Sequence, residues 1–177
     1  MQRTLFRRQS GVTLVEMAVV LGVTSVMLGS AAPHLIKTRH VQALDLAAAQ
    51  LRTDVQLARS TAVSLAKSVR LEVASTAAGS CYVIHTGGPS GCSCDSETTS
   101  CKAAGWVVRA AHFGSGQPVS VKGNAGMTFD GTLGTVTPTG TVTLSNVSGD
   151  QLKVIVNIMG RARTCKAAGT IVGHEPC

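Results

Sequence analysis

Residues 12–32 read VTLVEMAVVLGVTSVMLGSAA, an apolar segment of 21 residues whose only charged side chain is Glu16. About 20 predominantly apolar residues can cross a bilayer as a helix, so the sequence predicts a membrane-spanning helix here. Arg3, Arg7 and Arg8 precede the segment, and basic residues tend to stay on the cytoplasmic side. The rest of the chain is therefore expected to be exported. A secretory signal peptide fits less well, because its apolar core is usually about 7–15 residues long and ends in a small-residue cleavage site.

Length and composition limit the remainder of the chain. The 177 residues leave room for one globular domain beside the apolar segment. Hydrophobic residues make up 44% of the sequence and charged residues 14%, which excludes a disordered chain and a polytopic membrane protein. The formal net charge of +7 favours an anionic partner.

Glu16 is the unusual residue of the apolar segment. A carboxylate at the centre of a bilayer costs about 3 kcal/mol on insertion scales and is usually paired, although a position near the end of the helix lowers that cost. Two interpretations stay open at this point: the side chain reaches the lipid headgroups, or it meets a cation supplied by another subunit.

The residues Arg7 to Glu16, RRQSGVTLVE, resemble the class III leader and cleavage site of type IV pilins and pseudopilins. The resemblance implies that a prepilin peptidase cuts after Gly11 and methylates the new N-terminal residue, Val12. It also implies that Glu16 neutralises the N-terminal ammonium of a neighbouring subunit during assembly. Val12 stands where Phe is the most usual residue, and Pro33 falls where such helices commonly kink.

The same resemblance divides the chain into three parts. Residues 1–11 are expected to be the leader peptide and residues 12–36 the transmembrane and assembly helix. Residues 37–177 are expected to form a periplasmic domain, which holds the second half of the helix and a β-sheet. The expected location is the inner membrane, with a single pass, and then the pilus at the cell surface after assembly with other pilin subunits.

Beyond Pro33 the apolar residues continue to recur every three or four positions, which predicts that the helix continues into the domain. The residues of this stripe are Val41, Leu44, Ala48, Leu51, Val55, Ala58, Ala62 and Leu65. The charged residues between them are expected on a solvated outer face and are assigned no function: Asp45, Arg52, Asp54, Arg59 and Lys67.

The chain then changes to a strand-like pattern. Val69, Leu71 and Val73 alternate with charged residues, which indicates a half-buried strand. Clusters of Gly, Ser, Thr, Asn and Pro separate the further candidates, which are Tyr82 to His85, Gly105 to His112, Met127 to Asp130, Gly140 to Ser145 and Leu152 to Ile158. The expected fold class is α+β, a type IV pilin fold in which a long N-terminal helix packs on a mainly antiparallel sheet.

All six cysteines lie in the second half of the chain, as expected for an exported domain with disulfides. Cys165 and Cys177 bracket the tail and are expected to pair. Two more disulfides are expected among Cys81, Cys92, Cys94 and Cys101, with the connectivity open except that a Cys92–Cys94 bridge is geometrically unfavourable. A zinc site is the weaker alternative, because the spacing lacks a C-x-x-C pair.

The sequence contains no motif that indicates catalysis. The five histidines show no metal-ligand spacing, and neither a G-x-S-x-G elbow nor a P-loop is present. We therefore expect no enzymatic activity, no cofactor and no metal.

One basic motif follows the strand predicted at Leu152 to Ile158. In an extended chain Arg161 and Arg163 project to the same side, about 6.6 Å apart, where two guanidiniums can bind neighbouring phosphates. Lys166 lies nearby in the sequence and is expected to add a further cation to this phosphate-binding pair. The alternative is that the two arginines are simply solvated.

A pilin N-terminus, a mainly β domain and a final strand leading into G-R-x-R together resemble the GspH/FimT family of minor pilins and pseudopilins. In the FimT-like branch that motif is associated with DNA binding during natural transformation, and here it corresponds to Gly160, Arg161 and Arg163. The resemblance therefore implies a minor type IV pilin that binds DNA. The alternative is a structural pseudopilin of a type II secretion system, and a fibre-forming major pilin is a third possibility.

Overall fold

The computed structural model describes residues 11–102, 105–124 and 126–177, without the side chains of residues 30–34. The chain divides into two compact units, Met1–Thr38 and Arg39–Cys177, which are described separately. A single element, the 52-residue helix α1 (Leu14–Leu65), contributes to both. Its first part carries exposed large apolar side chains, among them Leu14, Leu21 and Leu28.

The N-terminal predictions fall partly outside this description. Residues 1–10 of the leader lie outside it, as do the side chains of residues 30–34, which include Pro33. In the described part of the chain, no helix has both the length and the hydropathy that crossing a membrane requires. The division at residues 11 and 36 and the kink at Pro33 stay predictions.

In the second unit, α1 buries the apolar stripe that the sequence predicts. Leu44, Leu51, Val55, Ala58 and Ala62 are fully buried. The helix ends with Ala66 in the left-handed region, at φ 50°, and the backbone N–H of Lys67 reaches back to the carbonyl of Ala62 at 3.2 Å. This is a helix C-cap of the kind usually formed by Gly.

The strands form two larger sheets and one hairpin, all with antiparallel pairing in the described ladders. The five-stranded sheet has the order β5-β2-β1-β7-β8, with β1 (Val69–Thr76), β2 (Gly79–Thr86), β5 (Val107–Gly114), β7 (Met127–Phe129) and β8 (Val136–Thr137). The four-stranded sheet has the order β11-β10-β9-β6, with β6 (Val119–Gly123), β9 (Gly140–Asn146), β10 (Gln151–Val156) and β11 (Ala162–Ala168). The hairpin pairs β3 (Cys92–Cys94) with β4 (Thr99–Cys101).

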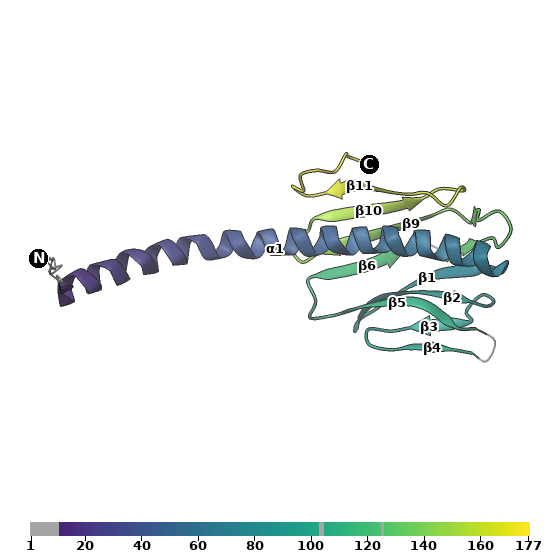
Figure 1. Cartoon of the computed structure of the whole chain (residues 1–177), viewed down its shortest axis with the longest axis horizontal. Coiled ribbons are helices and arrows are strands. Elements are labelled where there is room, and N and C mark those ends of the chain that lie inside the picture. Colours follow the sequence, from purple (N-terminus) through teal and green to yellow (C-terminus); the bar gives the residue numbers. More distant parts are fainter. Residues whose placement is uncertain (1–10, 103–104, 125) are drawn as a thin grey trace, which may run out of the picture. The chain divides into compact units, whose positions relative to one another are not determined.

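The two sheets lie side by side behind the second part of α1 (Figure 1). Their contact joins β6 to both β1 and β2: Gly123 of β6 lies against Val73 of β1, and the backbone N–H of Val121 donates to Ser80 Oγ of β2 at 2.8 Å. Alternating residues of both sheets, such as Leu71, Leu144 and Val154, join the α1 stripe in one buried core. The predicted α+β architecture, a helix packed on antiparallel sheets, is confirmed.

The prediction for Asp54 is wrong. Asp54 was expected on the solvated face of the helix, but it is only 2% exposed. Its carboxylate accepts hydrogen bonds from Tyr82 Oη at 2.6 Å and from Gln50 Nε2 at 2.9 Å, and Arg109 Nε lies 3.5 Å away. The sheet packs against a wider face of the helix than the apolar stripe alone, and this wider face includes Asp54. Burial, followed by the hydrogen bond to Asp54, raises the pKa of Tyr82 well above its ordinary value.

The last predicted strand is also shorter than expected. β10 ends at Val156 instead of Ile158, because the chain turns at Asn157 to Gly160 and returns as β11. The motif G-R-x-R therefore leads from β10 into a further strand, β11, so β10 is not the last strand of the domain. The sequence pattern did not predict the strands β3, β4, β6, β8 and β11.

Candidate functional site

Gly160 shapes the turn that carries the basic motif. The backbone N–H of Gly160 donates to the carbonyl of Asn157 at 2.9 Å, and the N–H of Asn157 donates to the carbonyl of Arg161 at 3.1 Å. Gly160 has φ +72°, the left-handed conformation typical of Gly in such a hairpin. It is buried, and a Cβ there would lie 2.9 Å from Arg59 Cδ. Gly160 therefore positions its neighbours and cannot offer a side chain to a ligand.

Arg161 and Arg163 are both exposed and lie next to this turn. Arg161 precedes β11, and its backbone N–H is held by Asn157 Oδ1 at 2.9 Å. Ala162, between the two arginines, packs against the core, so both flanking side chains face away from it. Neither arginine forms one of the ion pairs found among the described residues. Both guanidiniums are free to bind an anion.

Lys166 does not join the two arginines. In the ladder it lies opposite Leu152, a buried residue of β10, and it stands three positions after Arg163. Strand alternation therefore places Lys166 on the opposite face of β11 from Arg163. Its backbone binds the tail, because its N–H donates to the carbonyl of Glu175 at 2.7 Å and its carbonyl accepts the N–H of Cys177 at 3.0 Å.

Three disulfides join the six cysteines. Cys165 pairs with Cys177, which was the pairing expected from the sequence, and holds the tail against β11. The connectivity left open by the sequence is Cys81–Cys94 and Cys92–Cys101. These two bridges link β2 to β3 and β3 to β4, so the four-cysteine cluster is a brace for the β3–β4 hairpin.

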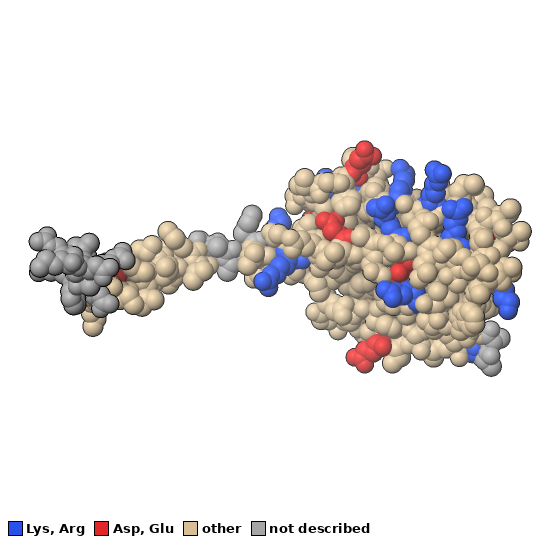
Figure 2. Space-filling view, in the orientation of Figure 1, with Lys and Arg blue, Asp and Glu red and all other residues tan. Residues whose placement is uncertain are grey.

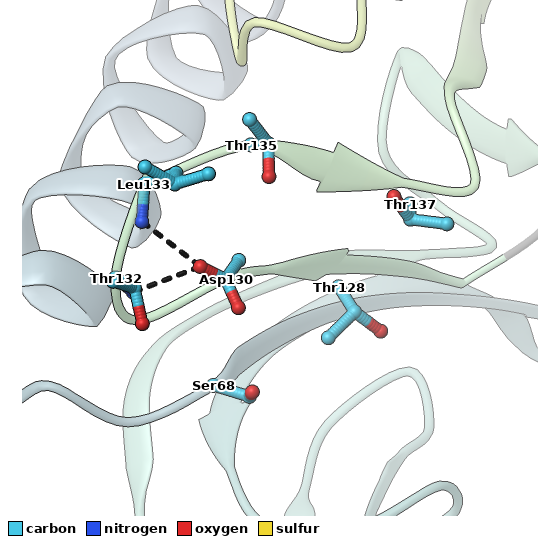
Figure 3. A pocket seen from close by; sticks show the side chains of 7 residues that line it. All are labelled: Ser68, Thr128, Asp130, Thr132, Leu133, Thr135 and Thr137. Atoms are coloured by element: carbon cyan, nitrogen blue, oxygen red, sulfur yellow. Dashed lines mark hydrogen bonds between the residues drawn. The ribbon is translucent and has the colours of Figure 1, made fainter.

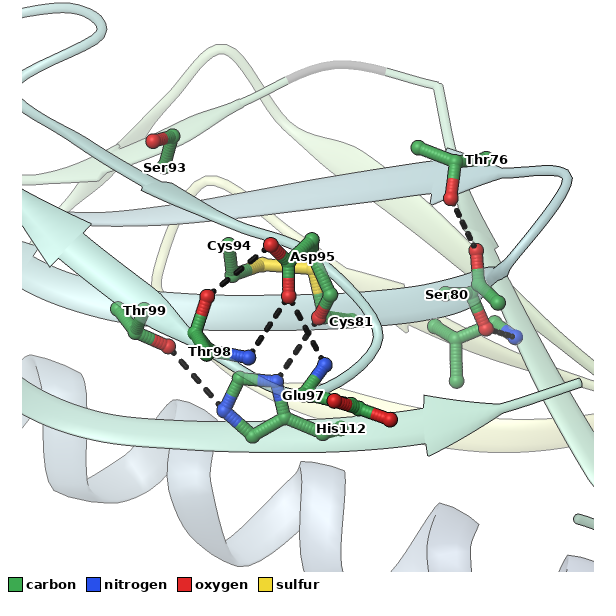
Figure 4. The surroundings of a disulfide bond; sticks show 12 residues. Thr76, Ser80, Cys81, Ser93, Cys94, Asp95, Glu97, Thr98, Thr99 and His112 are labelled. Carbon is green, nitrogen blue, oxygen red and sulfur yellow. Dashed lines mark hydrogen bonds between the residues drawn. A yellow bond between two sulfur atoms is a disulfide. The ribbon is translucent and has the colours of Figure 1, made fainter.

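The loop between β3 and β4 docks on β5 beside the Cys81–Cys94 bridge (Figure 4). Asp95 accepts hydrogen bonds from the backbone N–H groups of Glu97 and Thr98, which lower the pKa of its carboxyl group. His112 Nδ1 lies 2.9 Å from the carbonyl oxygen of Asp95, and His112 Nε2 lies 3.1 Å from Thr99 Oγ1. All of these polar groups are used to hold the loop.

An open pocket of about 700 Å³ lies beside β7 and β8 (Figure 3). Hydroxyl side chains dominate its lining, which consists of Ser68, Thr128, Asp130, Thr132, Leu133, Thr135 and Thr137. The Asp130 carboxylate accepts the backbone N–H groups of Leu133 at 2.9 Å and Thr132 at 2.8 Å, and these bonds lower its pKa. Asp130 therefore closes a turn.

The predicted processing site lies just before α1. Gly11 and Val12 are exposed and precede the helix, which begins at Leu14. Thr13 caps the helix, because its Oγ1 accepts the backbone N–H of Glu16 at 3.2 Å. Glu16 lies in the first helical turn, where a carboxylate is stabilised by the positive end of the helix dipole.

Comparison with known proteins gives matches over both parts of the chain. The family described as type II transport protein GspH matches residues 47–160, and the prokaryotic N-terminal methylation motif matches residues 6–32. The chain is 33% identical to the pilin-like protein PilA1 of Thermus thermophilus, over 86% of this chain and 96% of that protein. Alignment with the crystal structure of the type IV minor pilin FimU of Pseudomonas aeruginosa gives a TM-score of 0.49 at 22% identity, over 69% of this chain and 87% of that one.

These matches identify the family. The GspH match covers more than half of the chain, and the relative from Thermus is similar over nearly its whole length. The methylation motif contains Gly11, Val12 and Glu16, the three residues for which processing and assembly roles were expected. With its N-terminal helix and antiparallel sheets, the chain belongs to the GspH family of minor pilins and pseudopilins and has a type IV pilin fold.

Proposed function

We propose that this chain is a minor type IV pilin that is incorporated into a pilus and binds DNA without sequence specificity for uptake in natural transformation. The observation that carries the proposal is the pair Arg161 and Arg163. Both are exposed, both face away from the core, and both are free of ion pairs within the described residues. Guanidiniums bind phosphate with two parallel hydrogen bonds, so a pair of them suits a DNA backbone.

The distribution of aromatic residues supports contact with phosphates instead of bases. Proteins that bind single strands commonly stack bases on aromatic side chains. Here Tyr82 and Phe129 are fully buried, and Trp106 is exposed beside the end of α1, not at the β10–β11 turn. Duplex DNA should therefore bind at least as well as single-stranded DNA.

The N-terminal motif supports the proposed assembly into the pilus. In this proposal a prepilin peptidase cleaves between Gly11 and Val12 and methylates Val12, and the helix then anchors the protein in the inner membrane with a periplasmic domain. The exposed apolar side chains of the first part of α1 suit contact with lipid and with other pilin subunits. Glu16, in the first turn, would neutralise the N-terminal ammonium of a neighbouring subunit.

A structural pseudopilin of a type II secretion system is the second candidate. The description of the matching family, type II transport protein GspH, favours it. In that case the domain makes only protein contacts and needs no affinity for DNA.

DNA titration separates the two candidates. Full-length protein in a non-ionic detergent would be titrated into a fluorescent duplex at two salt concentrations. If about two to four phosphates are neutralised, the slope of log K against log salt should be roughly −2 to −4, with affinity in the micromolar range or weaker.

The arginine pair is tested with a double variant and a control of equal charge. Arg161→Gln with Arg163→Gln should remove most of the affinity while leaving the domain folded, because exposed charges contribute little to stability. Lys67→Gln with Lys102→Gln removes the same charge from two other exposed positions and should bind like wild type. Equal binding by wild type and the arginine variant would exclude the motif, and no binding by wild type would favour the secretion pseudopilin.

A further inference from the structure

The outer face of the four-stranded sheet continues the surface on which Arg163 lies. Leu144 of β9 and Val154 of β10 point into the core under α1. Strand alternation therefore turns their neighbours Thr143, Lys153 and Ile155 to the opposite face. Arg163 lies directly across from Ile155, and so belongs to the same outer face.

The strand register aligns further cations on this face. Lys122 of β6 lies across from Thr143, and Thr143 lies across from Lys153. Two strand spacings, about 9.6 Å, therefore separate Lys122 from Lys153. Lys153 and Arg163 are diagonal neighbours on adjacent strands, about 7–8 Å apart. The cations form a diagonal row from the β10–β11 turn to β6.

The remainder of the face has no opposing charge within the strands. Its other side chains on β6 and β9 are hydroxyls, namely Ser120, Thr141, Thr143 and Ser145. No strand of this sheet contributes a carboxylate to the face. Hydroxyls and cations are the groups that commonly bind the DNA backbone.

A second basic surface lies on the helix side of the domain and is an alternative candidate for binding DNA. Lys and Arg side chains gather in Figure 2 where α1 and β11 lie next to each other. There a groove is lined by Arg52, Gln56 and Ala162. Gln56 Nε2 donates to the carbonyl of Gly160 at 3.3 Å, and Arg59 Nε donates to that of Gly134 at 3.2 Å. Gln56 thus holds the β10–β11 turn and Arg59 holds the loop between β7 and β8, whereas strand alternation turns Arg161 and Arg163 to the opposite face of the sheet.

We infer that duplex DNA lies across the outer face of the β6-β9-β10-β11 sheet, with Lys153 and Lys122 binding phosphates in addition to the two arginines. The inference rests on the proposed function and adds the binding surface and its direction. From Arg163 on β11 to Lys122 on β6 the row crosses three strand spacings and one two-residue step along the strands, about 16 Å in all. At about 3.4 Å per step, this length corresponds to roughly five nucleotides of one DNA strand.

The test uses two double variants of the full-length protein in non-ionic detergent, with a fluorescent DNA duplex as the probe. Lys122→Gln with Lys153→Gln should raise Kd about tenfold and bring the salt slope closer to zero by roughly two, since each lost phosphate contact changes the slope by about one. Arg52→Gln with Lys166→Gln removes equal charge from the helix side and should change Kd by less than about twofold, because salt screens charges that make no contact. Lys122→Arg with Lys153→Arg should bind like wild type, and unchanged thermal unfolding shows that each variant is folded.

The outcomes separate this inference from the proposed function. If Arg161→Gln with Arg163→Gln loses binding while Lys122→Gln with Lys153→Gln binds like wild type, the proposed function stands and the sheet surface is wrong. If the helix-side variant loses as much affinity as the sheet variant, binding follows net charge and the inference is overturned. If wild type binds no duplex at all, both are overturned.

Discussion

Gly160 shows how one residue without a side chain prepares the candidate site. Its positive φ closes the β10–β11 turn, and the turn brings Arg161 back opposite Asn157, whose side chain then holds the Arg161 backbone. The absence of a Cβ also lets Arg59 pass close behind the turn. The glycine of the motif is thus required by backbone geometry, while the arginines supply the charge.

Replacing Gly160 by Ala should destabilise the domain by more than conformational strain alone. An Ala residue in the left-handed region costs roughly 1–2 kcal/mol. At Gly160 the new Cβ would also lie 2.9 Å from Arg59 Cδ and 3.1 Å from the Gly134 carbonyl oxygen, so a neighbour must move. Urea unfolding measures the loss, and duplex titration should show weaker binding because the arginines shift with the turn.

Gly149→Ala is the matched control for this prediction. Gly149 has φ +87°, but no neighbouring atom lies within 4 Å of an added Cβ. The Gly149→Ala variant therefore has the backbone strain of the left-handed conformation without a steric contact like that with Arg59. Gly160→Ala should therefore unfold at lower urea than Gly149→Ala. Equal midpoints for the two variants would show that the contact with Arg59 has no energetic effect.

Asp54 illustrates what helical periodicity misses at the level of a residue. Its position off the apolar stripe predicted an exposed side chain, although the predicted burial of the stripe itself is confirmed. The pattern cannot reveal that Tyr82, 28 positions further on, donates a hydrogen bond from β2. A buried carboxylate is acceptable only with such partners, and two of them, Tyr82 and Arg109, are distant in sequence.

At the level of elements, the hydrogen bond between Tyr82 and Asp54 joins α1 to β2. The folded state raises the pKa of Tyr82, so it holds the phenol proton more tightly than the unfolded chain does. The stability from this link is fully present below the unfolded pKa of about 10 and is lost as the pH rises towards the folded pKa. We expect the tyrosinate absorbance to appear only when the domain unfolds at alkaline pH.

The chain contains one tyrosine, so this absorbance reports Tyr82 alone. Tyr82→Phe removes a buried hydrogen-bond donor to Asp54 and should cost about 1–3 kcal/mol near neutral pH. It should also reduce the loss of stability above about pH 10 relative to wild type. Tyrosinate formation near pH 10 in a domain that remains folded by circular dichroism would contradict the assigned environment.

The elements that the sequence revealed are those with a strong apolar alternation. The second half of α1 and the strands β1, β2, β9 and β10 follow their predicted patterns, with ends shifted by a few residues. The strands β3, β4 and β11 consist mainly of Cys, Ser, Thr, Ala and basic residues, because disulfides and edge positions replace apolar packing there. The arginine pair could be found by spacing alone, but the row through Lys153 and Lys122 depends on the register between strands far apart in sequence.

At the scale of the whole molecule, the N-terminal motif predicts a defined mature protein. Cleavage after Gly11 leaves 166 of the 177 residues and removes three arginines, which lowers the formal net charge from +7 to +4. Intact-mass analysis of protein from the native host should find a chain that begins at methylated Val12. A larger residue at Gly11 should block cleavage at this bond. It should not disturb the fold, because Gly11 is exposed with open space around it.

A bulky substitution provides the control for this processing. Gly11→Val should yield the uncleaved mass at normal domain stability. A wild-type mass that retains the leader, or that begins after Ala32, would refute the prepilin assignment.

The Cys165–Cys177 disulfide, which holds the tail against β11, affects how the domain could associate with other copies. β11 is the edge strand of its sheet, and an open edge offers unpaired N–H and C=O groups to strands of other copies. The tail occupies part of that edge, because both backbone groups of Lys166 bind it, and the disulfide prevents it from leaving. Oxidation of these two cysteines is therefore expected to protect this edge against pairing with strands of other copies of the chain.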